Sequence, residues 1–442
     1  LHNIPSFAAE DSMIPEAVAR MSVDLFFIDH EIASGAEYWQ LEGRDWQKGV
    51  EEFIGRPEPL AAVARRIVGD AAEPMGQLER LYAEVQGFRN LSYEKDLTEE
   101  TKKEQKIKDN RRVEDVLERR YGLRSDLTRT FVKLAMAAGF EAEVVRVTAR
   151  DNKLFRKELL SFNDQLDSEI ALVKAAGRTM ALDPATPFCP FGLVHWARTN
   201  STGLRASGDP PGFFTTPLSP PDMALTQREI VLALDPQGGL AGTVKTTYRG
   251  QDALVRRLDH IRDDEVARRE ALEKELGDLL PMGATVRLTG VENIDNNEPS
   301  LIVTCDVAIP GLVNEAGGKT LVPFFPLAGS GQYPFRHAAR RYPVYLPYPS
   351  RQFDDIRITL PEGLAVAHRP QPRKNACDFS SYSVVCGQEA SNLLHIQRDL
   401  VIKKIFFPVE RYAALKAFFD QIRAIDAEQI VLAPGAGDLM GN

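Results

Sequence analysis

One stretch of the sequence decides the fold: Tyr121-Gly-Leu-Arg-Ser-Asp-Leu-Thr-Arg-Thr-Phe-Val-Lys-Leu-Ala-Met-Ala-Ala-Gly139. A tight Tyr-Gly turn precedes Ser125 and Asp126, either of which can cap the start of a helix. Gly139 is typical of a helix end, and the intervening residues place one apolar face on the helix: Leu127, Phe131, Leu134 and Ala138. We therefore expect an amphipathic helix that packs one face into a core.

Three strand-like segments follow this helix, at residues 142–148, 169–174 and 178–182. The last of them ends in Leu182-Asp-Pro-Ala-Thr186. A nucleophile at a helix start gains from the helix dipole and from free N–H groups that can hold an oxyanion, and a carboxylate after a later strand can orient a general base. The block from Tyr121 to Trp196 is therefore the part of the chain in which we look for chemistry.

The second half of the chain changes to a β pattern. Residues 301–309 alternate strictly between apolar and polar, which predicts that Cys305 faces a core. Further strands are expected near 230–234, 240–248, 355–360, 382–386, 392–398 and 401–406, with helices over about 263–280 and from Pro408 onward. The fold class that this predicts is α+β, with an antiparallel β-sandwich in the C-terminal half.

Composition excludes several classes of protein. The 442 residues include 54 Lys and Arg against 63 Asp and Glu, a net charge of −9, and 43% are hydrophobic. This balance is typical of a globular protein and disfavours a nucleic-acid partner. No apolar run approaches the roughly 18 residues that span a bilayer. Because the first residue is Leu1 rather than Met, we expect the chain to be a trimmed fragment that lacks any targeting segment.

Neither a metal nor a cofactor is predicted. The seven His residues form no pair with metal-ligand spacing, and residues 295–298 lack the spacing of a calcium-binding loop. The four cysteines include no Cys-x-x-Cys pair. Cys377 and Cys386 are nine residues apart in a hairpin-like stretch, so a local disulfide between them is left open.

The block from Tyr121 to Asp183 resembles the transglutaminase-like superfamily, which has a papain-like fold and a Cys-His-Asp triad. The family's nucleophile motif reads approximately Tyr-Gly-Asp-Cys-Lys-Asp, and its helix ends in Gly about 15 residues after the Cys. Here the matching run is residues 121–126, and Gly139 lies 15 residues after Arg124. The resemblance therefore implies that Arg124 stands in the place of the Cys, Ser168 in the place of the His, and Asp183 in the place of the Asp.

The resemblance extends over most of the chain. Residues 3–10 and 341–345 resemble parts of bacterial envelope proteins in which a transglutaminase-like core lies between two β-sandwich domains of unknown function. This implies a periplasmic or cell-envelope location. The domains we expect are a remnant of a first β-sandwich at 1–50 with a strand at 21–28, the transglutaminase-like core at 51–205, a proline-rich linker at 206–224, a β-sandwich at 225–406, and a helix and tail at 407–442.

The degenerate triad predicts a catalytically inactive protein. A guanidinium stays protonated and is no nucleophile, and loss of nucleophile and base costs many orders of magnitude in rate. Ser125 is adjacent, but a serine needs a general base within reach. We expect the Arg124 charge to be paired with the carboxylate of Asp183 or Asp126; the alternative is that it points into solvent.

Two function classes follow. The first is a non-enzymatic envelope protein that binds a peptide, glycan or protein partner. The second is a cysteine-type protease or acyl transferase with a rearranged site, in which Cys189 and His195 serve as nucleophile and base near Asp183. Cys189 lies between Phe188 and Pro190 with no helix start to lower its pKa, so we interpret it as a buried loop thiol. A thiol-reactive probe would separate the two classes.

Overall fold

The computed structural model describes residues 7–21, 23, 32, 34–94, 97–327 and 335–434. It divides the chain into two compact units, one of residues 15–219 and one that joins the N-terminal segment to residues 220–442. The protein is α+β, as the sequence predicts. The strand expected at 21–28 lies, apart from residues 21 and 23, outside the described residues.

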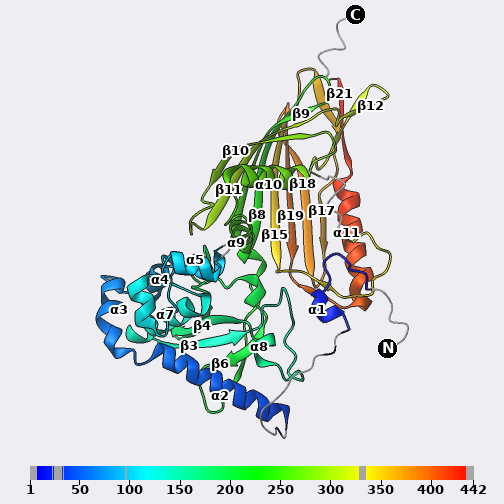
Figure 1. Ribbon diagram of the computed structural model, residues 1–442. Helices are drawn as coiled ribbons and strands as arrows, with labels where there is room; N and C mark the ends of the chain where they lie inside the picture. The colour runs from blue at the N-terminus through cyan, green and yellow to red at the C-terminus, as the bar shows by residue number, and fades with distance from the viewer. Residues whose placement is uncertain are drawn as a thin grey trace, which may run out of the picture. The chain divides into compact units, whose positions relative to one another are not determined.

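The unit of residues 15–219 combines helices with a five-stranded antiparallel sheet in the order β5-β4-β3-β6-β7 (Figure 1). Its helices are α1 (Glu16–Ala19), α2 (Gly35–Ile54), α3 (Ala61–Val68), α4 (Pro74–Gln86), α5 (Glu99–Glu104), α6 (Val113–Arg119), α7 (Arg124–Ala137) and α8 (Phe162–Gln165). Its sheet strands are β3 (Glu141–Val147), β4 (Ser168–Ala175), β5 (Arg178–Leu182), β6 (Thr202–Arg205) and β7 (Phe213–Thr215).

Helix α7 is the centre of this unit. It packs against β3 and β4 and also against α2, α3, α4 and α6. Of the apolar face that the sequence predicts, Leu127, Phe131 and Leu134 are buried, and the helix ends before Gly139, whose φ of 95° favours glycine. The expectation of a core helix packed on the following strands is therefore confirmed by the contacts.

Two boundaries differ from the sequence-based expectation. Helix α2 belongs to this core, because Trp39, Trp46 and Val50 are buried within it, although residues 1–50 were expected to be a β remnant. The proline-rich stretch 206–224 contributes β7 to the sheet rather than serving only as a linker. In both places tertiary packing outweighs the local composition.

The second unit contains an eight-stranded sheet in the order β10-β11-β9-β8-β15-β19-β18-β17. These strands are β8 (Ala224–Leu234), β9 (Leu240–Gly250), β10 (Thr285–Glu292), β11 (Ser300–Ile309), β15 (Ser350–Thr359), β17 (Arg373–Ala376), β18 (Ser380–Ala390) and β19 (Leu393–Ile402). The expected strand 392–398 is part of β19, which runs on to Ile402, whereas the expected strand 401–406 is divided between the end of β19 and β20 (Phe406–Phe407). Strands β8 and β15 are parallel, so the expected all-antiparallel arrangement is wrong at this pair.

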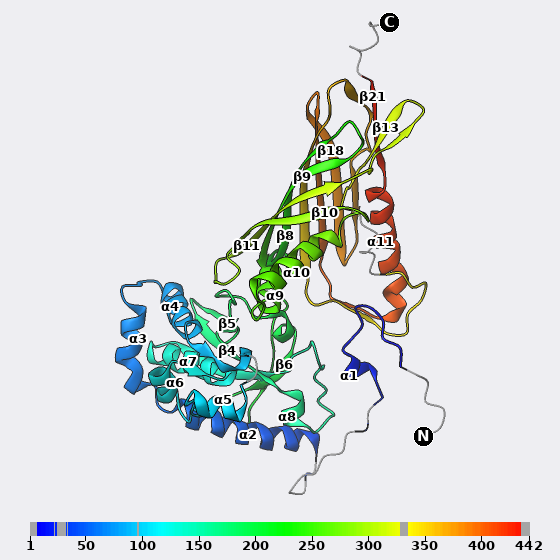
Figure 2. The ribbon, with the colours of Figure 1, turned by 45° about the horizontal axis from the view of Figure 1, so that its top comes forward.

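Helices and a smaller sheet cover one face of the eight-stranded sheet (Figure 2). The helices of this unit are α9 (Gln251–Asp259), α10 (Glu265–Gly277) and α11 (Tyr412–Asp426). The small sheet contains β12 (Asn314–Ala316), β13 (Lys319–Pro323), β21 (Gln429–Pro434) and β16 (Leu364–His368), and β14 (Val344–Tyr345) pairs with β20 (Phe406–Phe407). The layer facing the large sheet is therefore built from helices as well as strands, which corrects the simple two-sheet sandwich.

The N-terminal segment belongs to this second unit. Met13 forms an isolated bridge with Val344, and the Glu10 carboxylate accepts hydrogen bonds from the N–H groups of Arg341 and Tyr342. The C-terminal segment 407–434 is equally integral, because α11 and β21 share the same core.

All four cysteines are free thiols in the structure. Cys305 is buried, as the alternation on β11 predicts. The Cys377 N–H donates to Ser380 O, whereas Cys386 lies six residues further along β18. Six residues of strand span roughly 20 Å, which is far beyond the reach of a disulfide. The disulfide that the sequence left open is therefore excluded.

Candidate functional site

The candidate site lies at the start of α7, where a short parallel pair brings two segments together. Strand β1 (Arg89–Asn90) pairs with β2 (Tyr121–Gly122), and this pairing carries Ser92 and Tyr93 to the beginning of the helix. The Ser92 hydroxyl accepts the N–H of Arg124 at 3.0 Å.

Asp126 fixes the helix start. Leu123 is the cap residue, and the Asp126 carboxylate accepts the Leu123 N–H at 3.1 Å and an amide N–H of Asn110 at 3.2 Å. A Cβ at Gly122 would lie 2.9 Å from Cβ of Asp126, so this turn requires glycine. The sequence predicted a cap at Ser125 or Asp126; the helix begins earlier, because the Asp126 side chain reaches back to the residue that precedes the first turn. Asp126 is therefore a structural residue of the site.

Arg124 contacts Ser168 directly. Its Nη2 donates to Ser168 Oγ at 2.9 Å and to the backbone oxygen of Asp167 at 3.2 Å. Ser168 is the buried first residue of β4, and its hydroxyl donates to Asp167 Oδ1 at 2.9 Å. Arg124 and Ser168, two of the three positions that the sequence resemblance aligns with a catalytic triad, are thus in contact.

The expected pairing of Arg124 with a carboxylate does not occur. Arg124 Nη2 bonds to a hydroxyl and a backbone carbonyl, and neither Asp183 nor Asp126 forms an ion pair with it. The reason is that both carboxylates already have other donors. Burial lowers the pKa of Arg124, and the positive charge of the neighbouring Arg198 lowers it further. Tyr93 and Asp183 act in the opposite direction and raise the pKa of Arg124. Arg124 is half-buried, so the solvent-pointing alternative does not describe it either.

Asp183 is the most buried charge of the site, with a side-chain exposure of 0%. It accepts hydrogen bonds from Arg198 Nη1 at 2.6 Å, from Thr186 Oγ1 at 2.9 Å and from the His195 N–H at 3.2 Å. Burial by itself would raise the pKa of Asp183, but the charges of Arg198 and Arg124 and the hydrogen bond from Thr186 hold it below its ordinary value.

Arg198 is the residue that sequence reasoning missed. It lies in the short 3-10 turn Trp196–Arg198, and its side chain is 4% exposed. Burial opposes its charge, yet the Asp183 carboxylate and Tyr93 raise the pKa of Arg198 above its ordinary value. No local sequence pattern predicts the ion pair of Arg198 with Asp183, because the two residues are 15 positions apart across an irregular loop.

His195 is a neutral side chain in this environment. Burial, with Arg198 as the next cause, lowers the pKa of His195 to about 3. Its Nδ1 accepts the N–H of Ala197 at 3.3 Å, which leaves the ring proton on Nε2. The ring packs against Trp196 with 5.7 Å between centroids.

Cys189 lies in the same loop but is not poised for attack. Its thiol is completely buried and donates to Leu193 O at 3.4 Å. Burial raises the pKa of Cys189 well above its ordinary value, and the charge of Asp183 adds to this rise. The thiolate, rather than the thiol, is the nucleophile, so the geometry argues against the alternative nucleophile and base pair of Cys189 and His195.

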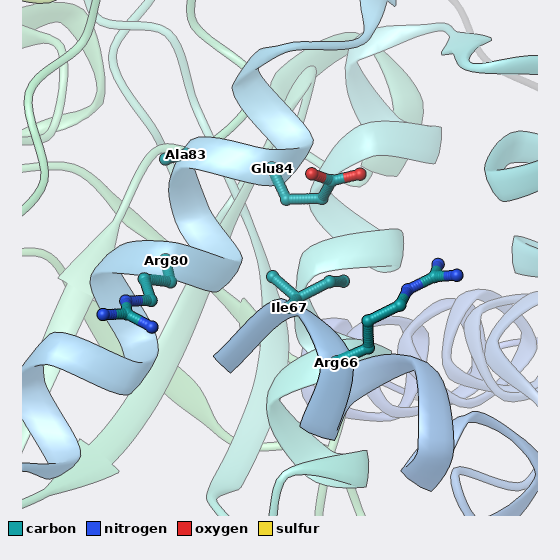
Figure 3. Close-up of a pocket in the computed structure, with 5 residues that line it drawn as sticks. All are labelled: Arg66, Ile67, Arg80, Ala83 and Glu84. Carbon is teal, nitrogen blue, oxygen red and sulfur yellow. The ribbon is translucent and has the colours of Figure 1, made fainter. Parts of the chain in front are cut away.

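A second feature of this unit is a shallow hollow of about 520 Å³ on α3 and α4 (Figure 3). It is lined by Arg66, Ile67, Arg80, Ala83 and Glu84. Arg80 is paired with Asp70, and Glu84 is paired with Arg120. Two of the three charged side chains that line the hollow therefore have an ion-pair partner at the surface. Neither a nucleophile nor a histidine is among its lining residues.

Two features are absent from the described residues. Within that part of the chain, no group of three or more His, Cys, Asp or Glu side chains is arranged to hold a metal ion. Among the described helices, none is both long and apolar enough to cross a bilayer.

Comparison with known proteins attaches one region to a family. Residues 319–432 match the family model DUF3858, described as a domain of unknown function with a solved structure. No curated protein matches the chain. The chain is similar to a solved structure from Parabacteroides distasonis described as a "putative protease", with 11% identity and a TM-score of 0.48. This similarity covers 93% of the present chain and 63% of the other, so the chain spans less than two thirds of that protein's length.

Proposed function

We propose that residues 15–219 are a transglutaminase-like core without catalytic activity, and that the protein acts in the cell envelope by binding a peptide, glycan or protein partner. The observation that carries this proposal is the contact between Arg124 Nη2 and Ser168 Oγ at the start of α7. The sequence resemblance assigns these two positions to the nucleophile and the base of the family. A guanidinium in contact with a hydroxyl has neither a nucleophile nor a general base to offer.

The remaining member of the triad-like set also supports binding rather than chemistry. Asp183 has Arg198 as its close partner, and this ion pair is buried. A carboxylate that orients a catalytic histidine needs a histidine ring within reach of its oxygens. Here the contact from His195 to Asp183 is through the backbone N–H, while the ring accepts from Ala197.

The test is an activity screen of the purified chain. We expect no hydrolysis of amide or peptide substrates and no amine incorporation into glutamine-containing peptides, with Cys189→Ala indistinguishable from the wild type. Turnover that Cys189→Ala abolishes would overturn the proposal and favour the alternative, a cysteine-type protease or acyl transferase with a rearranged site.

A gain-of-function variant tests the equivalence of positions. Arg124→Cys combined with Ser168→His rebuilds a thiol and an imidazole at the two family positions. We expect this thiol to react with iodoacetamide faster than the thiol of the matched control Ser125→Cys with Ser168→His, because only the first lies opposite residue 168. Equal rates would contradict the assignment of Arg124 to the nucleophile position.

A further inference from the structure

Several guanidinium groups gather around Arg124. Three guanidinium groups lie in this part of the unit, those of Arg124, Arg150 and Arg198. All three lie close enough to His195 for their positive charge to lower its pKa, and Arg198 also lowers the pKa of Arg124. The facing carboxylates are Asp183, which is buried, and Asp167, whose Oδ1 accepts from the Ala149 N–H and the Ser168 hydroxyl. Among the described residues neither carboxylate is paired with Arg124, because Asp183 pairs with Arg198 and Asp167 offers Arg124 only its backbone oxygen.

Among the described residues, no carboxylate forms an ion pair with Arg124. Asp183 is committed to Arg198 at 2.6 Å, and the two acceptors of Arg124 Nη2 are uncharged oxygens. A half-buried guanidinium without an ion-pair partner is costly, because partial burial removes water and nothing of opposite charge replaces it. An anion at this position would relieve that cost.

A second observation points in the same direction. Arg198 is 4% exposed, and its Nε is buried without a hydrogen-bond partner. Among the described residues, at least one guanidinium donor beside Asp183 therefore has no acceptor. Buried donors of this kind are uncommon in folded proteins and often mark a functional site or a bound water or ion.

We propose that the Arg124 cluster, the guanidinium groups of Arg124, Arg150 and Arg198, binds one carboxylate group, from the C-terminus of a peptide or from an acidic side chain. The proposal rests on the non-catalytic function proposed above and names the ligand class of the same site. A guanidinium presents paired N–H donors that match the two oxygens of a carboxylate. One guanidinium without a carboxylate partner among the described residues fits a monoanion, whereas a phosphate dianion would bring a second negative charge to the same donors.

The surroundings provide a surface for the rest of a peptide. Leu123, directly before Arg124, is 49% exposed, and the half-buried side chains of Tyr93 and Trp196 belong to the same cluster. Exposed apolar and aromatic groups beside a charged anchor are typical of peptide-binding sites.

Calorimetric titration of the full chain tests the proposal with four probes. These are acetyl-Ala-Ala with a free carboxylate, its C-terminal amide, acetyl-Glu-Ala amide, and inorganic phosphate. We expect the amide to show no binding and at least one carboxylate probe to bind, with an affinity that falls as salt is raised. The first and third probes distinguish a peptide C-terminus from an acidic side chain.

Two variants locate the binding. Arg124→Gln should weaken the affinity for the carboxylate probe by about tenfold or more. Arg124→Lys should weaken it by less, because Lys keeps the positive charge but loses the paired N–H donors of the guanidinium. Arg66→Gln is the matched control, since it removes one exposed positive charge from the hollow of Figure 3 in the same unit. Retention of the wild-type thermal unfolding midpoint in Arg124→Gln shows that the variant is folded; if it unfolds early, Arg124→Lys decides the question.

Each outcome is decisive. Absence of carboxylate binding by a wild-type chain that also shows no turnover would overturn the ligand assignment and leave the non-catalytic function standing. Phosphate binding as tight as carboxylate binding, or equal losses in Arg124→Gln and Arg66→Gln, would also overturn it. Turnover of any probe would instead overturn the proposed function.

Discussion

Asp183→Asn is expected to be strongly destabilising, although it keeps the shape of the side chain. The substitution removes the negative charge that faces Arg198 Nη1 at 2.6 Å, and leaves a guanidinium that is 4% exposed without its counter-ion. Breaking a buried ion pair by removing one partner costs about 3–5 kcal/mol. A unit of this size loses roughly 2–4 °C of unfolding midpoint per kcal/mol, so the midpoint should fall by about 6–20 °C.

Tryptophan fluorescence is the appropriate assay for this prediction. The chain has three tryptophans, Trp39, Trp46 and Trp196, and all of them lie in the unit of residues 15–219. Their emission therefore reports the unfolding of the unit that contains Asp183, without a contribution from tryptophan in the other unit. Urea and thermal titrations of the full chain would both be followed in this way.

Two further variants complete the experiment. Asp70→Asn removes a 93% exposed carboxylate paired with Arg80, and should leave the free energy of unfolding nearly unchanged, because water screens exposed ion pairs. Asp183→Leu combined with Arg198→Met removes both charges and should recover most of the lost stability. A loss below about 1 kcal/mol in Asp183→Asn would refute the reasoning, because it would mean that the pair is not buried in solution.

Three more predictions concern neighbouring groups. Because the pKa of His195 falls from 6.5 to about 3 on folding, the unfolded state binds protons more readily. The stability of its unit should therefore drop as pH falls from 6.5 towards 3, by up to about 1.4 kcal/mol per pH unit, and His195→Gln should flatten this slope in tryptophan-detected urea titrations. Iodoacetamide should label the partly exposed Cys377 in the folded chain and reach Cys189 only on unfolding, as mass spectrometry of digested protein would show. Asp126→Ala removes the bond to the Leu123 N–H and should cost about 1 kcal/mol by urea titration.

These three predictions have clear contrary results. A pH dependence between 6.5 and 4 that is the same in His195→Gln would show that other groups titrate there. Labelling of Cys189 as fast as Cys377 in the folded chain would show an accessible thiol and reopen the enzymatic alternative. A stability unchanged by Asp126→Ala would show that its carboxylate does not hold the start of α7.

The local pattern around residues 121–183 predicted much of the core. The helix, the three strands and the stop at Gly139 follow from periods of 3.6 and 2 and from the conformational freedom of glycine. The burial of Cys305 follows in the same way from alternation along one strand. These features depend on neighbours within a few residues, which the sequence displays directly.

Other features required contacts between distant residues. The parallel pairing of β8 with β15 joins strands more than 100 residues apart, and helix α2 enters the core of a unit whose sheet begins about 90 residues later. Neither the strand pairing nor the packing of α2 produces a local sequence pattern, because each depends on which apolar faces pack together in the folded chain.

The sequence by itself predicted that the protein is α+β and that Asp183 follows a strand, and it carried the resemblance from which we propose roles for the Arg124 and Ser168 positions. Only the tertiary structure decided what these groups do with their charges. It paired Asp183 with Arg198 and left Arg124 on neutral oxygens. The physical reason is that a buried carboxylate takes the donor that packing brings closest, and the order of residues along the chain does not specify which donor that is.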